Sequence, residues 1–329
     1  MEKNRVERIA AITVTYNRTA TLKRCLEALL HQTRPVDRIL VVDNHSREDE
    51  QQVLWQLAAQ DARIRIVNLP DNRGGAGGFE AGMRRARELY NPDWYWVMDD
   101  DAYPRQDCLE QLLTARQAVG GENIGFLAPI IWGLDLKEYQ LYHHKYIRGM
   151  TYKNIPLVSR LDELSETAEE EANGFVGPLI SKRAVEQVGI ADGSLFIYGD
   201  DTEYTYRVTR RLKGCVVKSA VIDHQDPPLS GNYLNPRAWW KEYYSNRNQY
   251  FMVRKYAGNV LMRVLGYGAL TLPIIKLMGA ALVKPKYRGC RRLRTALLFK
   301  AVRDGIADHR GKTLDPGSYN RMLDERDIK

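Results

Sequence analysis

The chain has 329 residues, of which 44% are hydrophobic and 27% are charged. These proportions are typical of a globular protein with a substantial core, and they exclude wholesale disorder, collagen-like repetition and a small disulfide scaffold. The four cysteines are far apart and form no CxxC pair, so we expect no zinc site built on cysteine spacing, and a reducing compartment is the simplest interpretation.

The charge is unevenly distributed along the chain. The net charge is +8, but residues 231–329 hold 20 basic and 7 acidic side chains, a net of +13, whereas residues 1–230 carry a net of −5. Such asymmetry indicates that the basic C-terminal region meets an anionic partner, either nucleic acid or a membrane surface. A solvated basic helix is the alternative interpretation.

Strand and helix patterns alternate from the N-terminus to residue 130. Strands are predicted over residues 8–16, 38–43, 64–69 and 94–98, and helices over 19–30, from 46, over 76–89 and over 106–119. Thr19 is the expected cap of the first helix, and Ser46 with Asp49 forms a capping signal for the second. This order predicts an α/β fold with a mostly parallel, Rossmann-like sheet and helices on both faces.

Polar residues follow the predicted strands where each one ends. The clusters are Thr15-Tyr16-Asn17, Asp43-Asn44, Asn72-Arg73-Gly74-Gly75 and Asp99-Asp100-Asp101. Because ligands of such sheets bind beyond the carboxyl ends of the strands, we expect these clusters to converge on one crevice. Residues 133–175 are predicted to be a loop-rich insertion with one short helix, and residues 214–222 a strand that ends at Asp223-His224.

The region after Asn235 has a different character. Residues 235–300 contain 14 basic residues and a single acid, Glu242, with aromatic residues interleaved. The uncharged run from Val264 to Ile275 is interrupted by glycine and proline, and we expect it to be too short to span a membrane. A basic, aromatic, amphipathic helical region favours an anionic membrane surface, and packing against the body or a dimer interface is the alternative.

Three acidic side chains end the fourth predicted strand. Carboxylates repel one another, so their clustering favours a divalent cation, and hard oxygen ligands favour Mg²⁺ or Mn²⁺. Alternate residues of an extended segment point the same way, so Asp99 and Asp101 would share one ion. A turn rich in helix-capping aspartates is the alternative. His224 is a candidate third ligand, with a structural histidine as its alternative.

Two further motifs are candidates for chemistry. The run from Asn72 to Phe79 is rich in glycine, which lets a phosphate or sugar approach the backbone, and a plain tight turn is the alternative. It matches neither the dinucleotide fingerprint nor a Walker loop. In Gly199-Asp200-Asp201-Thr202, one carboxylate is a candidate general base, and a helix N-cap is the alternative. No nucleophile elbow and no recognised nucleic-acid-binding motif is present.

Taken together and in this order, these motifs resemble those of the family 2 inverting glycosyltransferases of the GT-A fold. The resemblance covers residues 8–230 and rests on VTYNR (14–18), VVDNHS (41–46), the glycine-rich run, DDD and GDDTEY. NRGGAGGF (72–79) followed by DWYWVMDDDA (93–102) is most similar to bacterial galactofuranosyltransferases.

The resemblance implies roles for the matching positions. Thr15, Tyr16 and Asp43 would hold the uracil and ribose of UDP, and Asn72, Arg73 and Asp100 would also lie in the nucleotide-sugar site. Asp99 and Asp101 match the metal-binding D-x-D positions, and His224 matches the third ligand of Mn²⁺ or Mg²⁺. Asp201 matches the catalytic base. Gly177, Pro178 and Asp200 would belong to the sugar and acceptor cleft.

The expected protein is therefore a metal-dependent, inverting enzyme that moves galactofuranose from UDP-galactofuranose onto a lipid-linked or polysaccharide acceptor. Its GT-A domain is expected over residues 1–232, with a nucleotide-sugar half to residue 130 and an acceptor half after it, and its basic helical region over 233–329. We expect a cytoplasmic protein, peripheral on the inner face of the membrane, with no nucleic-acid partner. Transfer from dTDP-rhamnose and a non-catalytic binding module are the alternatives, and homo-oligomer formation stays open.

Overall fold

The computed structural model describes residues 6–225 and 235–325, which divide into two compact units. The α/β unit comprises the described residues up to Tyr146, Ile155–Gly193 and those from Asp201 to Gln225. The helical unit comprises Ile147–Asn154, Ser194–Asp200 and the described residues from Asn235. Two short segments of the body thus belong to the helical unit, whereas the sequence predicted a single boundary near residue 232.

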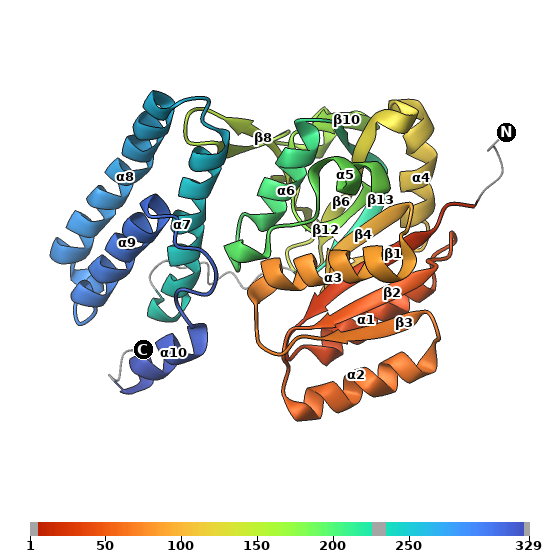
Figure 1. The fold of residues 1–329 in the computed structure, drawn as a ribbon, viewed down its shortest axis with the longest axis horizontal. Coiled ribbons are helices and arrows are strands. Elements are labelled where there is room, and N and C mark those ends of the chain that lie inside the picture. Colours follow the sequence, from red (N-terminus) through yellow and green to blue (C-terminus); the bar gives the residue numbers. More distant parts are fainter. Residues whose placement is uncertain (1–5, 226–234, 326–329) are drawn as a thin grey trace. The chain divides into compact units, whose positions relative to one another are not determined.

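A mixed sheet forms the centre of the α/β unit, with the strand order β10-β13-β6-β12-β4-β1-β2-β3 (Figure 1). Its strands are β1 Ile9–Thr15, β2 Arg38–Asp43, β3 Ile64–Asn68, β4 Trp94–Asp99, β6 Ile124–Gly133, β10 Thr167–Glu170, β12 Val176–Ser181 and β13 Lys213–His224. The neighbours β4, β1, β2 and β3 are parallel, and so are β6 and β13, while β12 is antiparallel to both β4 and β6. This arrangement confirms the predicted α/β class.

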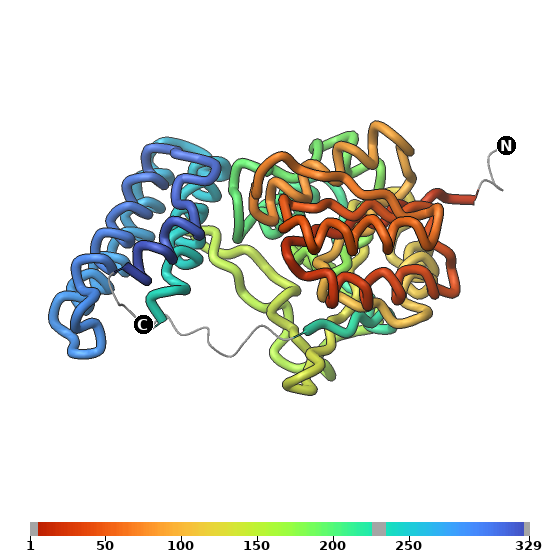
Figure 2. Tube along the Cα trace, turned by 90° about the horizontal axis from the view of Figure 1, so that it is seen from below, coloured from red at the N-terminus to blue at the C-terminus, as the bar shows by residue number. Residues whose placement is uncertain are grey.

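Helices cover both faces of this sheet. They are α1 Thr19–Leu30, α2 Glu48–Gln60, α3 Gly74–Tyr90, α4 Cys108–Val119, α5 Lys182–Val188 and α6 Asp200–Thr209. Alternate side chains of a strand point to opposite faces, so Ile9 and Ala11 of β1 pack with α1, α2 and α4, whereas Ala10 and Ile12 pack with α3, α5 and α6. In Figure 2 the red coils of α1 and α2 lie side by side over the sheet.

Two predicted helix caps are wrong. The Thr19 hydroxyl donates to Glu50 Oε2 at 2.5 Å instead of capping α1. Helix α2 begins at Glu48, two residues after Ser46, and the Ser46 hydroxyl accepts from the Asn17 backbone N–H at 2.9 Å instead of capping the helix. Both side chains therefore join the turn after β1 to the start of α2.

The segment between β6 and β12 forms short strands and 3₁₀ turns instead of the predicted short helix. Its strands are β7 Glu138–Tyr139, β8 His144–Arg148, β9 Lys153–Pro156, β10 and β11 Ala172–Asn173, and its 3₁₀ turns are Leu141–His143 and Leu161–Glu163. β7 pairs with β6, and the three strands β11, β8 and β9 form a small second sheet. A further short strand, β5 Ala102–Pro104, pairs with the end of β13.

The helical unit contains α7 Trp239–Tyr256, α8 Val260–Val283, α9 Arg291–Ile306 and α10 Pro316–Glu325. Helices α7, α8 and α9 lie side by side in both views (Figures 1 and 2). The aromatic side chains of α7 that the sequence assigned to a membrane interface are mostly its core, with Trp239, Tyr243, Tyr244, Tyr250 and Phe251 all buried. These residues pack within the helical unit, whereas the alternative interpretation expected packing against the body or a dimer interface.

Helix α8 corrects a second expectation about the same region. The sequence predicted a short, interrupted apolar run, but the helix is continuous over 24 residues and contains Pro273. Proline removes one backbone hydrogen bond, and Pro273 is exposed, so water can satisfy the carbonyl that is left without its partner. Among the described helices, α8 is long and apolar enough to cross a membrane by length and composition.

Candidate active site

The parallel register brings the carboxyl ends of β1, β2 and β4 to one edge of the sheet. Val14 pairs with Asp99, and Thr15 pairs with Asp43. The Thr15 hydroxyl donates to Asp100 Oδ2 at 2.7 Å across this edge. Two of the four polar clusters therefore meet through a buried hydrogen bond, as the strand ends predicted.

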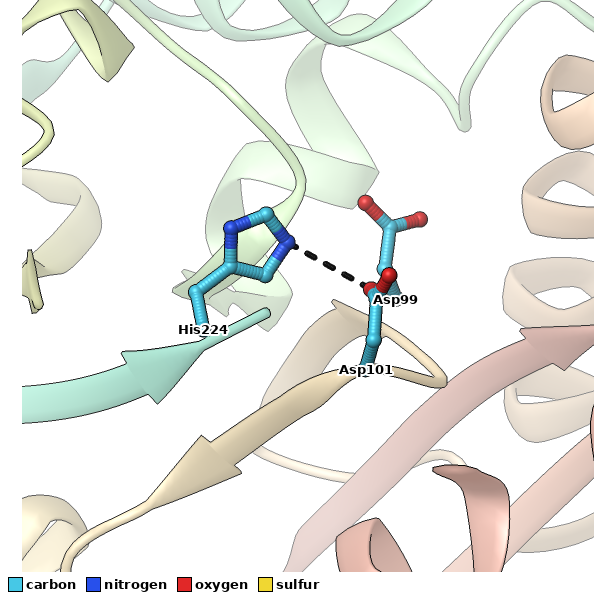
Figure 3. Close-up of side chains that lie close together, drawn as sticks. All are labelled: Asp99, Asp101 and His224. Carbon is cyan, nitrogen blue, oxygen red and sulfur yellow. Dashed lines mark ion pairs between the residues drawn. The ribbon is translucent and has the colours of Figure 1, made fainter. Parts of the chain in front are cut away.

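Asp99, Asp101 and His224 come together at this edge from two parts of the fold. Figure 3 shows the imidazole of His224, at the end of β13, facing the carboxylates of Asp99 and Asp101 at the turn after β4. One ligand atom from each residue lies within 4.8 Å of the others, and His224 Nε2 lies 3.4 Å from Asp101 Oδ1. Two carboxylate oxygens and one imidazole nitrogen form a donor set that fits a divalent cation.

The middle aspartate has different partners. Asp100 is 3% exposed and turns away to Thr15 and Arg18, whose guanidinium lies 3.0 Å from Asp100 Oδ1 and 2.6 Å from Asp101 Oδ2. Burial raises the pKa of Asp100 to about 7, although Arg18 and the Thr15 hydroxyl favour its ionised form. Asp100 therefore fixes the turn that presents its two neighbours.

Asp101 is held in its ionised form. Burial acts to raise the pKa of Asp101, but hydrogen bonding and charge from His224 and Arg18 outweigh it, and the net shift is downward. A carboxylate that stays charged beside a histidine is suited to ligate a cation. Arg18 was not singled out from the sequence, although it lies within the VTYNR motif.

Gln140 orients His224 from the outer side of the cluster. Gln140 Oε1 lies 2.9 Å from His224 Nδ1 and 3.2 Å from His143 Nε2. A carbonyl oxygen only accepts, so each of these nitrogens donates to Gln140, and the second ring nitrogen of His224, Nε2, faces Asp101. Burial, with Lys145 nearby, lowers the pKa of His143 well below its usual value. Gln140 and His143 lie in the irregular insertion, where no sequence pattern identified them.

Asp201 lies in the first turn of α6, and Gly174 separates its carboxylate from the imidazole of His143. A methyl group added at Gly174 would lie 2.6 Å from His143 Nδ1 and 3.4 Å from Asp201 Oδ2, so the glycine lets these two side chains approach. Lys145 Nζ lies 4.0 Å from Asp201 Oδ2 and donates to the Thr202 hydroxyl at 2.9 Å. Gln140 thus links His224 to His143, and His143 and Asp201 both lie next to Gly174.

The predicted nucleotide-sugar residues lie at the neighbouring strand ends. Asp43 is fully buried and accepts from the Ser46 N–H through Oδ1, while Oδ2 has no hydrogen-bond partner among the described residues. An unpartnered buried carboxylate oxygen is suited to accept from a ligand hydroxyl or N–H. Tyr16 is 46% exposed, and its ring is available for stacking.

Asn44 connects the glycine-rich turn to this edge by hydrogen bonds. The sequence placed it in a polar cluster but gave it no role of its own. Its amide donates to the Gly74 carbonyl at 3.0 Å and to Asn72 Oδ1 at 3.3 Å, and its carbonyl accepts from the Arg73 N–H at 2.9 Å. The Arg73 side chain is half exposed and pairs with Asp71 at 3.2 Å. Asn72 and Arg73 thus border the same edge as Asp43.

The glycines that follow serve close packing of helix on strand. Gly74 opens α3, and Gly78 and Gly82 lie inside it. A methyl group at Gly78 would overlap Val14 Cγ1, and one at Gly82 would lie 2.5 Å from Ile12 Cγ2. From the sequence, the glycine-rich run was interpreted as room for a phosphate or sugar, or as a tight turn. In the structure, Gly78 and Gly82 instead let α3 lie directly on β1.

Gly177 and Pro178, predicted for the acceptor cleft, are buried at an irregularity of β12. The Gly177 carbonyl accepts from Trp96 Nε1 at 2.9 Å, and a methyl group at this glycine would overlap the Ile222 side chain. Both residues therefore shape the sheet from within, and neither presents an exposed side chain. Asp200, from the same prediction, is 7% exposed at the start of α6.

Comparison with known proteins shows which proteins this chain is similar to. Residues 10–147 match the model of glycosyl transferase family 2. Over these residues the chain is similar to members of that family. Galactofuranosyltransferase GlfT1 of Mycolicibacterium smegmatis is 30% identical over 207 residues, and the protein of that name from Mycobacterium tuberculosis H37Rv is 29% identical over 204 residues. Each match covers 62% of this chain but 66% and 65% of the relative, slightly less than two thirds.

Solved structures share the fold at low sequence identity. GalNAc-T7 with UDP, GalNAc and Mn²⁺ superposes with a TM-score of 0.55 at 15% identity, over 74% of this chain and 52% of that one. The mannosyltransferase PcManGT of Pyrobaculum calidifontis, in complex with GDP-Man and Mn²⁺, gives 0.53 at 13% identity, over 93% and 89%. These likenesses confirm the GT-A fold.

Proposed function

We propose that the protein is an inverting glycosyltransferase that moves galactofuranose from UDP-galactofuranose onto a glycan acceptor. The observation that carries the proposal is the Asp99–Asp101–His224 cluster at the carboxyl ends of the strands. Gln140 links His224 to His143, and His143 and Asp201 both lie next to Gly174. The two galactofuranosyltransferase relatives support the donor. UDP and Mn²⁺ in the GalNAc-T7 structure support a nucleotide sugar and a divalent ion.

In the proposed reaction, Asp201 accepts the proton of an acceptor hydroxyl. That oxygen forms a bond to the anomeric carbon of the donor while the bond from this carbon to the diphosphate oxygen breaks, so the anomeric centre inverts. Asp99, Asp101 and His224 would hold Mn²⁺ or Mg²⁺, which supplies positive charge to the departing diphosphate. Lys145 contacts the Asp201 carboxylate and the Thr202 hydroxyl in the first turn of α6, which fixes this end of the helix.

We place the donor at the edge formed by β1, β2 and α3. Tyr16 and Thr15 would contact the base, and the unpartnered Oδ2 of Asp43 would accept from the base or ribose. Asn72, Arg73 and Asp100 complete the proposed nucleotide-sugar set, with Arg73 near the diphosphate because its guanidinium is half exposed at this edge.

Two substitutions test the base. Asp201→Asn should lower transfer by about 10²-fold to 10⁴-fold, because an amide cannot accept the proton, while UDP still binds in the presence of Mn²⁺. Asp200→Asn, at the adjacent acid, is the matched control and should retain a larger rate. Turnover is measured with synthetic acceptors and UDP binding by calorimetry. Near-normal transfer by Asp201→Asn, with Asp200→Asn inactive, would show that Asp201 is not the base.

We also infer that the acceptor is lipid-linked and that α8 docks the enzyme on an anionic membrane at the cytoplasmic face. One side of α8 packs within the helical unit through Gly266, Ile274 and Ala281, which are buried. The opposite side exposes aliphatic residues, among them Val264, Leu265, Leu272, Ile275 and Leu282. Basic residues flank this face within α8 and in the segment after it, at Arg263, Lys276, Lys284, Lys286 and Arg288.

An aliphatic face flanked by cations is typical of a helix that lies in the interface of an anionic bilayer. Co-sedimentation with vesicles of phosphatidylglycerol or phosphatidylcholine tests this docking. The wild type should sediment with the anionic vesicles and dissociate as salt is raised, and Leu272→Gln with Ile275→Gln should weaken binding. Equal sedimentation of the double variant and the wild type would exclude this face as the docking surface.

A further inference from the structure

The segment before Asp201 has an unusual backbone. Phe196, Tyr198 and Gly199 have φ angles of +67°, +66° and +83°, and two of these residues carry a bulky side chain. Left-handed backbone is unfavourable for such residues and persists only where surrounding contacts impose it. The segment Ser194–Asp200, which we name the base loop, belongs to the helical unit and leads directly into Asp201.

Asn248 of α7 holds the base loop by its backbone. It is 4% exposed, and its side-chain amide lies 3.0 Å from the Leu195 carbonyl, 2.9 Å from that of Ile197 and 2.7 Å from that of Tyr198. These carbonyls belong to residues that have positive φ or adjoin one that does. One amide group thus closes the turn that the chain takes before α6.

Arg247 holds Asn248 in place and adds a further bond to the base loop. Its side chain is fully buried, donates from Nε to Asn248 Oδ1 at 2.9 Å, and donates to the Leu195 carbonyl at 2.9 Å. Its remaining donors reach the Gly311 carbonyl at 2.7 Å and the Thr313 hydroxyl at 2.8 Å. The Gly311 N–H in turn donates to the Ser194 carbonyl at 2.6 Å.

Aromatic packing completes the support. The guanidinium of Arg247 lies 4.6 Å from the ring centre of Tyr244, and the ring centre of Phe196 lies 4.7 Å from that of the same tyrosine. A buried arginine with its donors paired and its face on an aromatic ring is a rigid support. Backbone hydrogen bonds and aromatic packing therefore hold the base loop against the rest of the helical unit.

We propose that Asn248, braced by Arg247, is a positioning residue for glycosyl transfer: it fixes the strained base loop and so sets where the Asp201 carboxylate lies. This inference rests on the proposed role of Asp201 as the base. It gives the helical unit a part in catalysis that is separate from membrane docking. Neither residue contacts substrate in this proposal, and both act through the backbone that enters α6.

The test compares Asn248→Ala with Tyr250→Phe. Tyr250 is a buried residue of the same helix whose hydroxyl bonds to Thr271 of α8 at 2.9 Å, away from the base loop. Asn248→Ala should lower kcat by about 10-fold to 100-fold, with the donor KM changed less than about twofold, because misplacing a catalytic group by about 1 Å costs about this much. Tyr250→Phe should leave kcat near the wild-type value at a similar melting temperature.

Gly199→Ala perturbs the base loop without replacing a residue of α7, and its methyl group would lie 4.0 Å from Asn248 Cβ, an ordinary contact. Its φ of +83° is unfavourable for alanine, so we expect the same loss of kcat with UDP binding retained. The double variant Asn248→Ala with Asp201→Asn should be no slower than Asp201→Asn alone, since a residue that acts through the base has no effect once the base is gone. A merely structural role would instead lower the residual rate further.

Hydrogen exchange gives a readout that does not need activity. Amides of residues 196–202 should exchange at least about tenfold faster in Asn248→Ala than in Tyr250→Phe, because the bonds that hold this backbone are lost. Unchanged exchange there, or a wild-type kcat in both Asn248→Ala and Gly199→Ala, would overturn the proposal. If the wild type transfers no sugar, the proposed function fails, and the exchange rates alone decide whether Asn248 fixes the base loop.

Discussion

Replacing Gln140 tests how the fold prepares His224 for a cation. Gln140 is 3% exposed, and its Oε1 accepts from His224 Nδ1 at 2.9 Å. Gln140→Leu keeps the volume but removes the acceptor, which leaves a buried N–H unpaired at a cost of about 1–3 kcal/mol. Loss of the partner that orients a ligating histidine typically weakens metal binding about 10-fold to 100-fold, equivalent to about 1.4–2.8 kcal/mol. The cost of the unpaired N–H and the typical loss of metal binding are similar in size, so we expect Gln140→Leu to weaken metal binding about 10-fold to 100-fold.

Mn²⁺ affinity in the presence of UDP is measured by the electron paramagnetic resonance signal of free Mn²⁺. Gln140→Glu is the matched control, because it keeps an oxygen that accepts from Nδ1, and its affinity should stay closer to that of the wild type. Melting curves confirm that both variants fold. Wild-type Mn²⁺ affinity in folded Gln140→Leu would refute the argument that this hydrogen bond prepares His224.

Three further outcomes are expected. Gly78→Ala should lower the free energy of unfolding by about 1–3 kcal/mol in chemical denaturation, because its methyl group would overlap Val14 Cγ1, and an unchanged midpoint would contradict the packing of α3 on β1. Asp304 is buried, and although burial acts to raise its pKa, bonds from Lys300 and Tyr243 lower it below the usual value. The stability that ionised Asp304 contributes is therefore complete above about pH 4 and is lost as the pH falls. The difference in melting temperature between the wild type and Asp304→Asn should accordingly become smaller as the pH is lowered from about 6 to about 3. Gly174→Ala should lower kcat, since its methyl group would lie 2.6 Å from His143 Nδ1 and 3.4 Å from Asp201 Oδ2 and would displace His143, and a wild-type rate in steady-state kinetics would contradict a role for this close packing.

The Asp99–Asp101–His224 cluster could be predicted because each of its residues lies at the end of a predicted strand. Asp99 and Asp101 follow an apolar strand, and His224 ends another, so strand topology alone brings them to one edge. Asp100 shows the limit of that reasoning. The sequence cannot tell which of three consecutive aspartates turns to Thr15, because this depends on the conformation of the turn.

The supporting residues could not be predicted, because they reach the site over long sequence separations. Gln140 and His224 are 84 residues apart, and Asn248 lies 50 residues beyond Tyr198. Nothing near Gln140 or Asn248 in the sequence distinguishes it from a surface residue. The aromatic residues of α7 were assigned to a membrane for a related reason, since composition does not say whether the side of a helix that carries Tyr243 and Tyr244 faces lipid or protein.

The most direct test of the central claim is a donor panel with synthetic glycan acceptors, read by NMR for linkage and anomeric configuration. The proposed function predicts transfer from UDP-galactofuranose with inversion, abolished by EDTA and restored by Mn²⁺ or Mg²⁺. Transfer from dTDP-rhamnose in place of UDP-galactofuranose, retention at the anomeric carbon, or full activity in EDTA would contradict it.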